Sequence, residues 1–192
     1  RIAQFNNLKS KALYGLVNKA IQDMVIKDHG MAKWEEIKQL AGMQEDRLVS
    51  LKSYPDKLTY DLVGAASKVL GADAENILKA FGEHWVLYTA EEGYGEMLDF
   101  TGSTLVQFLK NLDLLHLRVK NMMPQLDPPK FECENVTDNS AELVYSSNRE
   151  GLAPMVIGLL HGLGKRFKVE LEVEHIVKKE VDGGSDRFLV RW

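Results

Sequence analysis

Three closely spaced prolines, Pro124, Pro128 and Pro129, divide this chain into two parts with different hydrophobic periodicity. Proline lacks a backbone N–H and clashes with the preceding turn, so a helix cannot continue through this segment. Before it, apolar residues recur at helical spacing, and after it they alternate as they do in strands. The sequence therefore predicts an α+β fold, with a helical N-terminal part followed by an antiparallel sheet and one helix.

The helical part begins near Leu13, and the segment 91–95, which contains two glycines, is expected to interrupt it. Asp73 and Ser103 precede two of the expected helices and are candidate N-caps. The apolar pattern predicts helices over residues 13–24, 34–40, 58–70, 74–89, 94–100 and 104–122, with a turn at 53–56. Beyond the prolines it predicts strands over residues 131–136, 142–147, 167–177 and 187–192, with a helix over 151–165.

Composition limits the classes of function open to this chain. Its 192 residues are 45% hydrophobic, which is enough for one domain whose core could enclose a ligand. The net charge of -4 and the lack of a long basic run argue against a nucleic-acid partner. The single cysteine, Cys133, excludes an internal disulfide. No apolar run reaches membrane-spanning length and no signal peptide opens the chain, so the cytosol is the expected location.

His116 is the first residue that could carry chemistry. It falls on one helical stripe with Leu105, Leu109, Leu112 and Val119, so its imidazole is expected among apolar side chains. A buried histidine of this kind is often a core residue whose ring bonds a backbone carbonyl. A neutral imidazole in an apolar pocket is also what haem iron requires of an axial ligand. This residue alone leaves both interpretations open.

A second feature is the alternating row of Tyr145, Ser147 and Arg149. On a strand, residues two apart point to the same side, so a phenol, a hydroxyl and a guanidinium would share one face. All three donate hydrogen bonds, and arginine can hold a carboxylate through two parallel bonds. The row is either a polar outer face of a strand or a site for an anion with acidic arms.

Five segments of the sequence together match the pattern of a known family. They are residues 13–18 (LYGLVN), 60–67 (YDLVGAAS), 111–116 (NLDLLH), 128–133 (PPKFEC) and the Tyr-x-Ser-x-Arg row from Tyr145 to Arg149. Through these segments the sequence resembles the H-NOX family, the haem-nitric oxide/oxygen binding domains. That family includes bacterial stand-alone sensors and the haem domain of soluble guanylate cyclase. The resemblance runs from about Leu13 to the C-terminus.

The resemblance implies a non-covalent haem b, that is, iron protoporphyrin IX. By the same resemblance His116 is the iron ligand, and Tyr145, Ser147 and Arg149 hydrogen-bond the haem propionates. Pro129 matches a proline that presses on the porphyrin and distorts it. A single porphyrin would then explain both the buried imidazole and the row of donors.

The choice of gas is expected to depend on the side of the pocket opposite His116. Oxygen-binding members carry a tyrosine there, at a position that falls on Met155 in this chain. Because a thioether cannot donate a hydrogen bond, we expect nitric oxide and carbon monoxide to bind and oxygen to be excluded. The pocket residues implied by the resemblance are Val17, Ile21, Trp85, Thr89, Met155 and Leu159.

Three alternatives remain open. An oxygen sensor of the same fold could use the Trp85 indole N–H in place of the missing tyrosine. A haem enzyme such as a peroxidase would need a distal acid–base group, which these pocket residues do not offer. An interaction module without haem would leave Tyr145, Ser147 and Arg149 as surface residues.

The resemblance implies a sensor domain rather than an enzyme. Nitric oxide would weaken the bond between iron and His116, and an effector such as a histidine kinase or a cyclase would read the resulting shift. We expect the haem-binding domain to span residues 13–192, with residues 1–12 as an N-terminal extension or linker.

Overall fold

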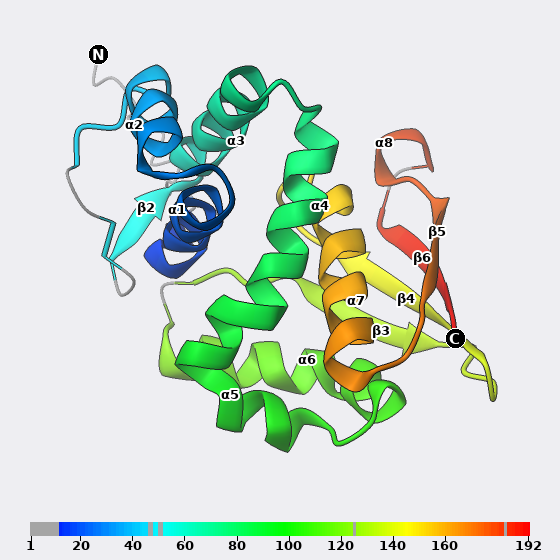
Figure 1. Ribbon diagram of the computed structural model, residues 1–192. Coiled ribbons are helices and arrows are strands. Elements are labelled where there is room, and N and C mark those ends of the chain that lie inside the picture. The colour runs from blue at the N-terminus through cyan, green and yellow to red at the C-terminus, as the bar shows by residue number, and fades with distance from the viewer. Residues whose placement is uncertain (1–11, 46–47, 50–51, 125, 183) are drawn as a thin grey trace, which may run out of the picture.

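The computed structural model describes residues 12–192 apart from 46–47, 50–51, 125 and 183 (Figure 1). Most of the predicted N-terminal extension, residues 1–11, thus lies outside the described residues. The described chain forms helices followed by a four-stranded antiparallel sheet, which confirms the predicted α+β fold. None of the helices in the described ranges has both the length and the apolarity needed to cross a bilayer.

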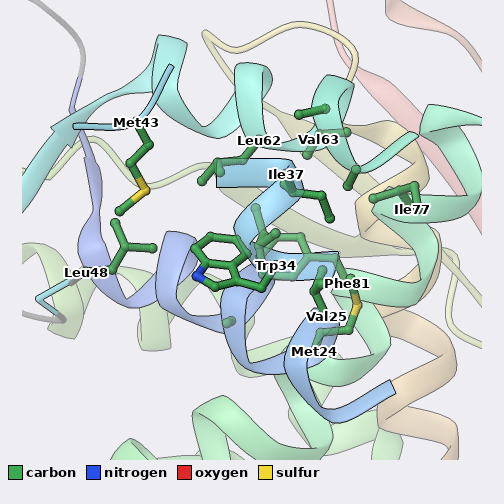
Figure 2. Packing of buried hydrophobic residues seen from close by; sticks show 14 of the residues in the cluster. Met24, Val25, Trp34, Ile37, Met43, Leu48, Leu62, Val63, Ile77 and Phe81 are labelled. Atoms are coloured by element: carbon green, nitrogen blue, oxygen red, sulfur yellow. The ribbon is translucent and has the colours of Figure 1, made fainter. Parts of the chain in front are cut away.

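Three helices pack together at the N-terminal end: α1 (Gly15–His29), α2 (Met31–Leu40) and α3 (Asp56–Leu70). Figure 2 shows the fully buried Trp34 indole among side chains of their shared core, which include Val25, Ile37 and Phe81. Two short strands, β1 (Ala12–Tyr14) and β2 (Ser53–Pro55), pair antiparallel beside these helices. The sequence predicted a helix start and a turn at these two places, because three residues are too few to show alternation.

The middle of the chain is a nearly continuous helical segment. Helix α4 (Ala74–His84) runs into a π-helix, η1 (Trp85–Thr89), and then into α5 (Ala90–Thr101). The predicted interruption at 91–95 is reduced to a kink at Tyr94, where φ is -143° and ψ is 23°. Helix α6 (Leu105–Met122) follows, and its N-cap is Thr104 rather than Ser103. The Thr104 Oγ1 accepts a hydrogen bond from the backbone N–H of Gln107 at 3.3 Å.

The sheet has the strand order β3-β4-β6-β5 and every pairing in it is antiparallel. Its strands are β3 (Lys130–Glu134), β4 (Ser140–Ser146), β5 (Glu172–Val177) and β6 (Asp186–Arg191), with the short helix α8 (Lys179–Asp182) between the last two. Helix α7 (Ala153–Phe167) lies between α4 and the sheet (Figure 1). A second core joins α6, α7 and the inner face of the sheet.

Helices α4 and α7 approach so closely that their backbones touch at glycines. A Cβ atom on Gly158 of α7 would overlap the carbonyl oxygen of Lys79 on α4. A Cβ atom on Gly82 of α4 would likewise overlap the carbonyl oxygen of Met155 on α7. Helices can come this close only where side chains are absent. The two helices are therefore fixed to one another as a pair.

His84, at the end of α4, is buried although it follows the charged residue Glu83 in the sequence. The residue is only 8% exposed, and its ring packs on Tyr88 with 4.8 Å between the ring centroids. Burial, aided by the positive charge of Lys27, lowers the pKa of His84. The position follows from the buried face of α4, which also carries Ile77, Leu78 and Phe81.

The lowered pKa of His84 predicts how stability changes with pH. Because the unfolded chain binds a proton on this histidine more readily than the folded chain, the free energy of unfolding should fall as the pH drops through the ordinary histidine range near 6.5. Chemical denaturation between pH 8 and pH 5 would measure this. His84→Phe should flatten the pH dependence, whereas His29→Gln, at an exposed position, should not. An unchanged slope in His84→Phe would contradict this account.

Candidate functional site

One mainly apolar cavity lies where the N-terminal helices, α6, α7 and the sheet meet. Its walls come from segments far apart in the chain, including α1, α4, η1, β3 and β4. The structure brings to this cavity nine of the eleven residues that the sequence singled out: Val17, Trp85, His116, Pro129, Tyr145, Ser147, Arg149, Met155 and Leu159.

His116 lies on the inner side of α6 and lines the cavity. Its Nδ1 is 2.9 Å from the carbonyl oxygen of Leu112, one helical turn earlier. A carbonyl can only accept, so Nδ1 carries the proton and donates it. Burial lowers the pKa of His116, so the ring is neutral and its Nε2 keeps a lone pair. That is the protonation state of a histidine that ligates a metal through Nε2.

An aromatic wall connects His116 to the row of donors. The Phe131 ring on β3 lies 5.2 Å from the His116 ring and 5.1 Å from the Tyr145 ring, measured between centroids. Phe131 and Tyr145 are direct partners in the β3–β4 ladder, so the register of the sheet sets this stack. Phe131 was not among the residues predicted for the site, although it follows Pro129 by only two residues.

The three donors follow one another along the end of β4. Tyr145 is in the strand and is only 4% exposed, and burial raises the pKa of its phenol, which keeps the hydroxyl protonated. Its side chain hydrogen-bonds that of Ser147, which lies just past the strand. The Ser147 Oγ in turn accepts the backbone N–H of Arg149 at 3.1 Å. These contacts hold three donor side chains at one end of the cavity.

Arg149 is oriented by partners from two other parts of the chain. Its Nε donates to Asp56 Oδ2 at 3.0 Å, and one of its terminal nitrogens donates to the carbonyl of Asp127 at 2.7 Å. The side chains of Arg149 and Asp56 are only 6% and 15% exposed, so this ion pair is largely shielded from water. Asp56 was not predicted, because the two residues are 93 positions apart and no local pattern links them.

The residues expected opposite His116 divide into two groups. Trp85 lines the cavity from η1, and Met155 and Leu159 line it from α7. Ile21 is instead fully buried in the core of the N-terminal helices and is not among the residues that line the cavity. Residue Thr89 ends η1, but its side chain lies outside the described residues.

The cavity fits a porphyrin on chemical grounds. The ring of a porphyrin needs apolar walls, its iron needs an axial ligand, and its two acids need hydrogen-bond donors. The cavity offers apolar walls, a neutral imidazole on α6 and three donors at the end of β4. The residues that line this cavity therefore match what a haem requires of its site.

Comparison with known proteins gives the family. The Haem-NO-binding family model, HNOB, matches residues 14–175, and this chain belongs to that family. It is a haem-binding gas-sensor family, and the matched region is the sensor domain.

Relatives and solved structures agree with this family. The chain is 26% identical over 155 residues to soluble guanylate cyclase 89Db of Drosophila melanogaster, covering 81% of this chain and 23% of the relative. It is 29% identical over 157 residues to soluble guanylate cyclase gcy-34 of Caenorhabditis elegans, covering 80% and 23%. The chain thus spans about a quarter of the length of these cyclases.

Two solved structures share the fold. An H-NOX protein from S. oneidensis in the Fe(II)NO ligation state superposes with a TM-score of 0.84 at 21% identity, covering 93% of this chain and 98% of that one. The I5F mutant of T. tengcongensis H-NOX superposes with a TM-score of 0.81 at 25% identity, covering 93% and 97%.

Proposed function

We propose that this domain binds one haem b and senses nitric oxide and carbon monoxide without forming a stable complex with oxygen. The observation that carries the proposal is the convergence of His116 and the Tyr145, Ser147 and Arg149 donors on one apolar cavity. A haem held by these residues would supply an iron atom that can bind a diatomic gas.

In this proposal each residue has a distinct task. His116 ligates through Nε2, because Nδ1 is bonded to the Leu112 carbonyl. Tyr145, Ser147 and Arg149 hydrogen-bond the two carboxylates and thereby fix the orientation of the ring. Pro129, which lines the cavity just before β3, would contact the ring.

The gas preference rests on the residues that line the cavity from η1 and α7. Met155 has a thioether where oxygen binding would be helped by a hydroxyl donor, so oxygen gains no hydrogen bond there. Nitric oxide and carbon monoxide bind ferrous haem without such a donor. Oxygen sensing remains the second candidate, because Trp85 lines the same cavity and its indole N–H has no hydrogen-bond partner among the described residues.

Absorption spectra of the ferrous haem protein test the gas preference. Nitric oxide and carbon monoxide should each shift the spectrum at one equivalent, whereas air should produce no stable oxygen-bound form. Trp85→Phe should leave the responses to nitric oxide and carbon monoxide in place. If wild type binds oxygen stably and Trp85→Phe does not, the oxygen-sensing alternative is correct.

The signal is proposed to leave the domain through α6. This helix carries His116 on its inner side, while Leu114 and Leu117 are 53% and 52% exposed. Because His116 and these two leucines lie on the same helix, a change in the force on the His116 ring would also move the apolar outer surface of α6. We propose that an effector such as a histidine kinase or a cyclase contacts this surface and that residues 13–192 act as sensor without catalysis of their own. Residues 1–12 are proposed to be an N-terminal extension or linker.

A further inference from the structure

Ser147 is held by a contact that the strand pairing of the sheet does not provide. The β3–β4 pairing ends at Ser146, and the β4–β6 pairing ends at Tyr145, opposite Asp186. Ser147 therefore lies just beyond the regular ladder. Its carbonyl oxygen accepts a hydrogen bond from Lys179 Nζ at 2.8 Å. Lys179 belongs to α8, in the connection between β5 and β6.

A buried carboxylate fixes the start of that connection. Asp186 Oδ1 accepts the backbone N–H of Lys179 at 3.1 Å and lies 2.8 Å from His175 Nε2. The Asp186 side chain is only 5% exposed, and the His175 ring stacks on Phe188 with 4.6 Å between centroids. His175 is also largely shielded from water, since its side chain is only 16% exposed.

A second contact joins the same connection to the end of β4. The hydroxyls of Ser146 and Ser185 are 2.6 Å apart, within hydrogen-bond distance. The connection is thus attached at both ends of α8, by Lys179 at its first residue and by Ser185 after it. On the other side, these contacts are made by Ser146, the last residue of β4, and by Ser147, the middle residue of the row of donors.

We propose that Lys179 is a positioning residue of the carboxylate-binding row, held in place by Asp186. Its ammonium group fixes the Ser147 peptide, and Ser147 in turn orients its neighbours, because its side chain contacts both the Tyr145 phenol and the Arg149 backbone N–H. Lys179 is not among the residues that line the cavity, so it acts through Ser147 rather than on the ligand. The inference rests on the proposed binding of haem by this row.

The rate at which haem leaves the protein for an excess of a haem-binding scavenger tests this role. Lys179→Met should speed release about tenfold, because a charge-assisted hydrogen bond that orders the donors is lost. Lys179→Arg, which can still donate to the carbonyl, should stay close to wild type. Lys178→Met serves as the matched control at the neighbouring exposed lysine and should release haem at the wild-type rate.

Haem dimethyl ester separates positioning of the donors from general stability. Its two propionates are esterified and carry no charge, so the exact position of the hydrogen-bond donors matters less for its binding. Lys179→Met should therefore speed release of the ester less than about threefold. Equal acceleration for haem and for the ester, or none for either, would overturn the proposal. So would an effect of Lys178→Met as large as that of Lys179→Met.

Amide exchange provides a readout that does not depend on haem. The backbone N–H of Arg149 is bonded to Ser147 Oγ, so Lys179→Met should raise its exchange rate about tenfold in the purified chain. An unchanged exchange rate would contradict the positioning role. If wild type fails to bind haem but this amide responds to Lys179→Met, the proposed function is wrong while the structural link from Lys179 to Ser147 stands.

Discussion

Replacing His116 with glycine should lower the affinity for haem by more than about 100-fold, because loss of only an outer-shell partner of a metal ligand already costs about 10- to 100-fold. Among the described residues that line the cavity, His116 is the only histidine. Its ring is neutral and its Nδ1 is already bonded, so Nε2 is the atom available to a metal. Titration of haem into the purified protein, followed in the Soret band, measures the change.

Free imidazole gives this variant an internal check. His116→Gly leaves a space in which added imidazole can replace the lost ring, so millimolar imidazole should restore much of the Soret intensity. His29→Gly, at an exposed position on α1, should bind haem as wild type does. A His116→Gly protein whose Soret band and affinity match those of wild type would remove His116 from the site.

The second large effect is expected at Gly158. Its Cβ would overlap the backbone carbonyl of Lys79, and a backbone cannot move aside as a flexible side chain can. Gly158→Ala should therefore destabilise the domain by about 3 kcal/mol, at the upper end for overpacking. For a chain of this size that corresponds to a fall in Tm of roughly 10 °C, measurable by thermal denaturation.

A glycine on another helix provides the control. Gly64 lies in α3, and a Cβ placed on it would meet no atom within 4 Å. Gly64→Ala should leave Tm unchanged or raise it, because alanine favours a helix over glycine by up to about 1 kcal/mol. Equal Tm values for Gly158→Ala and wild type would show that α4 and α7 can separate without cost.

The contact at Gly158 also bears on the gas-binding side of the cavity. Trp85 follows α4 directly, and Met155 lies on α7 one turn before Gly158. Because α4 and α7 are fixed to one another, the positions of these two cavity residues are coupled. A Gly158→Ala protein that still folds should therefore bind carbon monoxide with altered affinity, whereas Gly64→Ala should not.

The features that sequence predicted well are those set by local chemistry. The stripe that includes Leu105, Leu112 and His116 predicted α6 and its inner face, because side-chain direction follows directly from helical spacing. Alternation predicted β3 and β4, and the prolines predicted where the helical part ends. Tyr145, Ser147 and Arg149 were predicted to share a direction, and all three line the cavity.

The features that sequence missed depend on contacts between distant segments. The Asp56–Arg149 ion pair and the link from Lys179 to Ser147 join residues 93 and 32 positions apart. His175 lies beside Glu174 in the sequence, yet its ring packs on Phe188 of the adjacent strand. No periodicity within a single element contains this information.

The most direct test of the account is the stoichiometry of haem binding. When haem is titrated into the wild-type chain, the Soret absorbance should rise until one haem is bound per chain and then show a sharp break. His116→Gly, titrated under the same conditions, should show no such break unless imidazole is added. A wild-type titration without a break, or the same break in His116→Gly, would contradict the claim that this cavity holds a haem through His116.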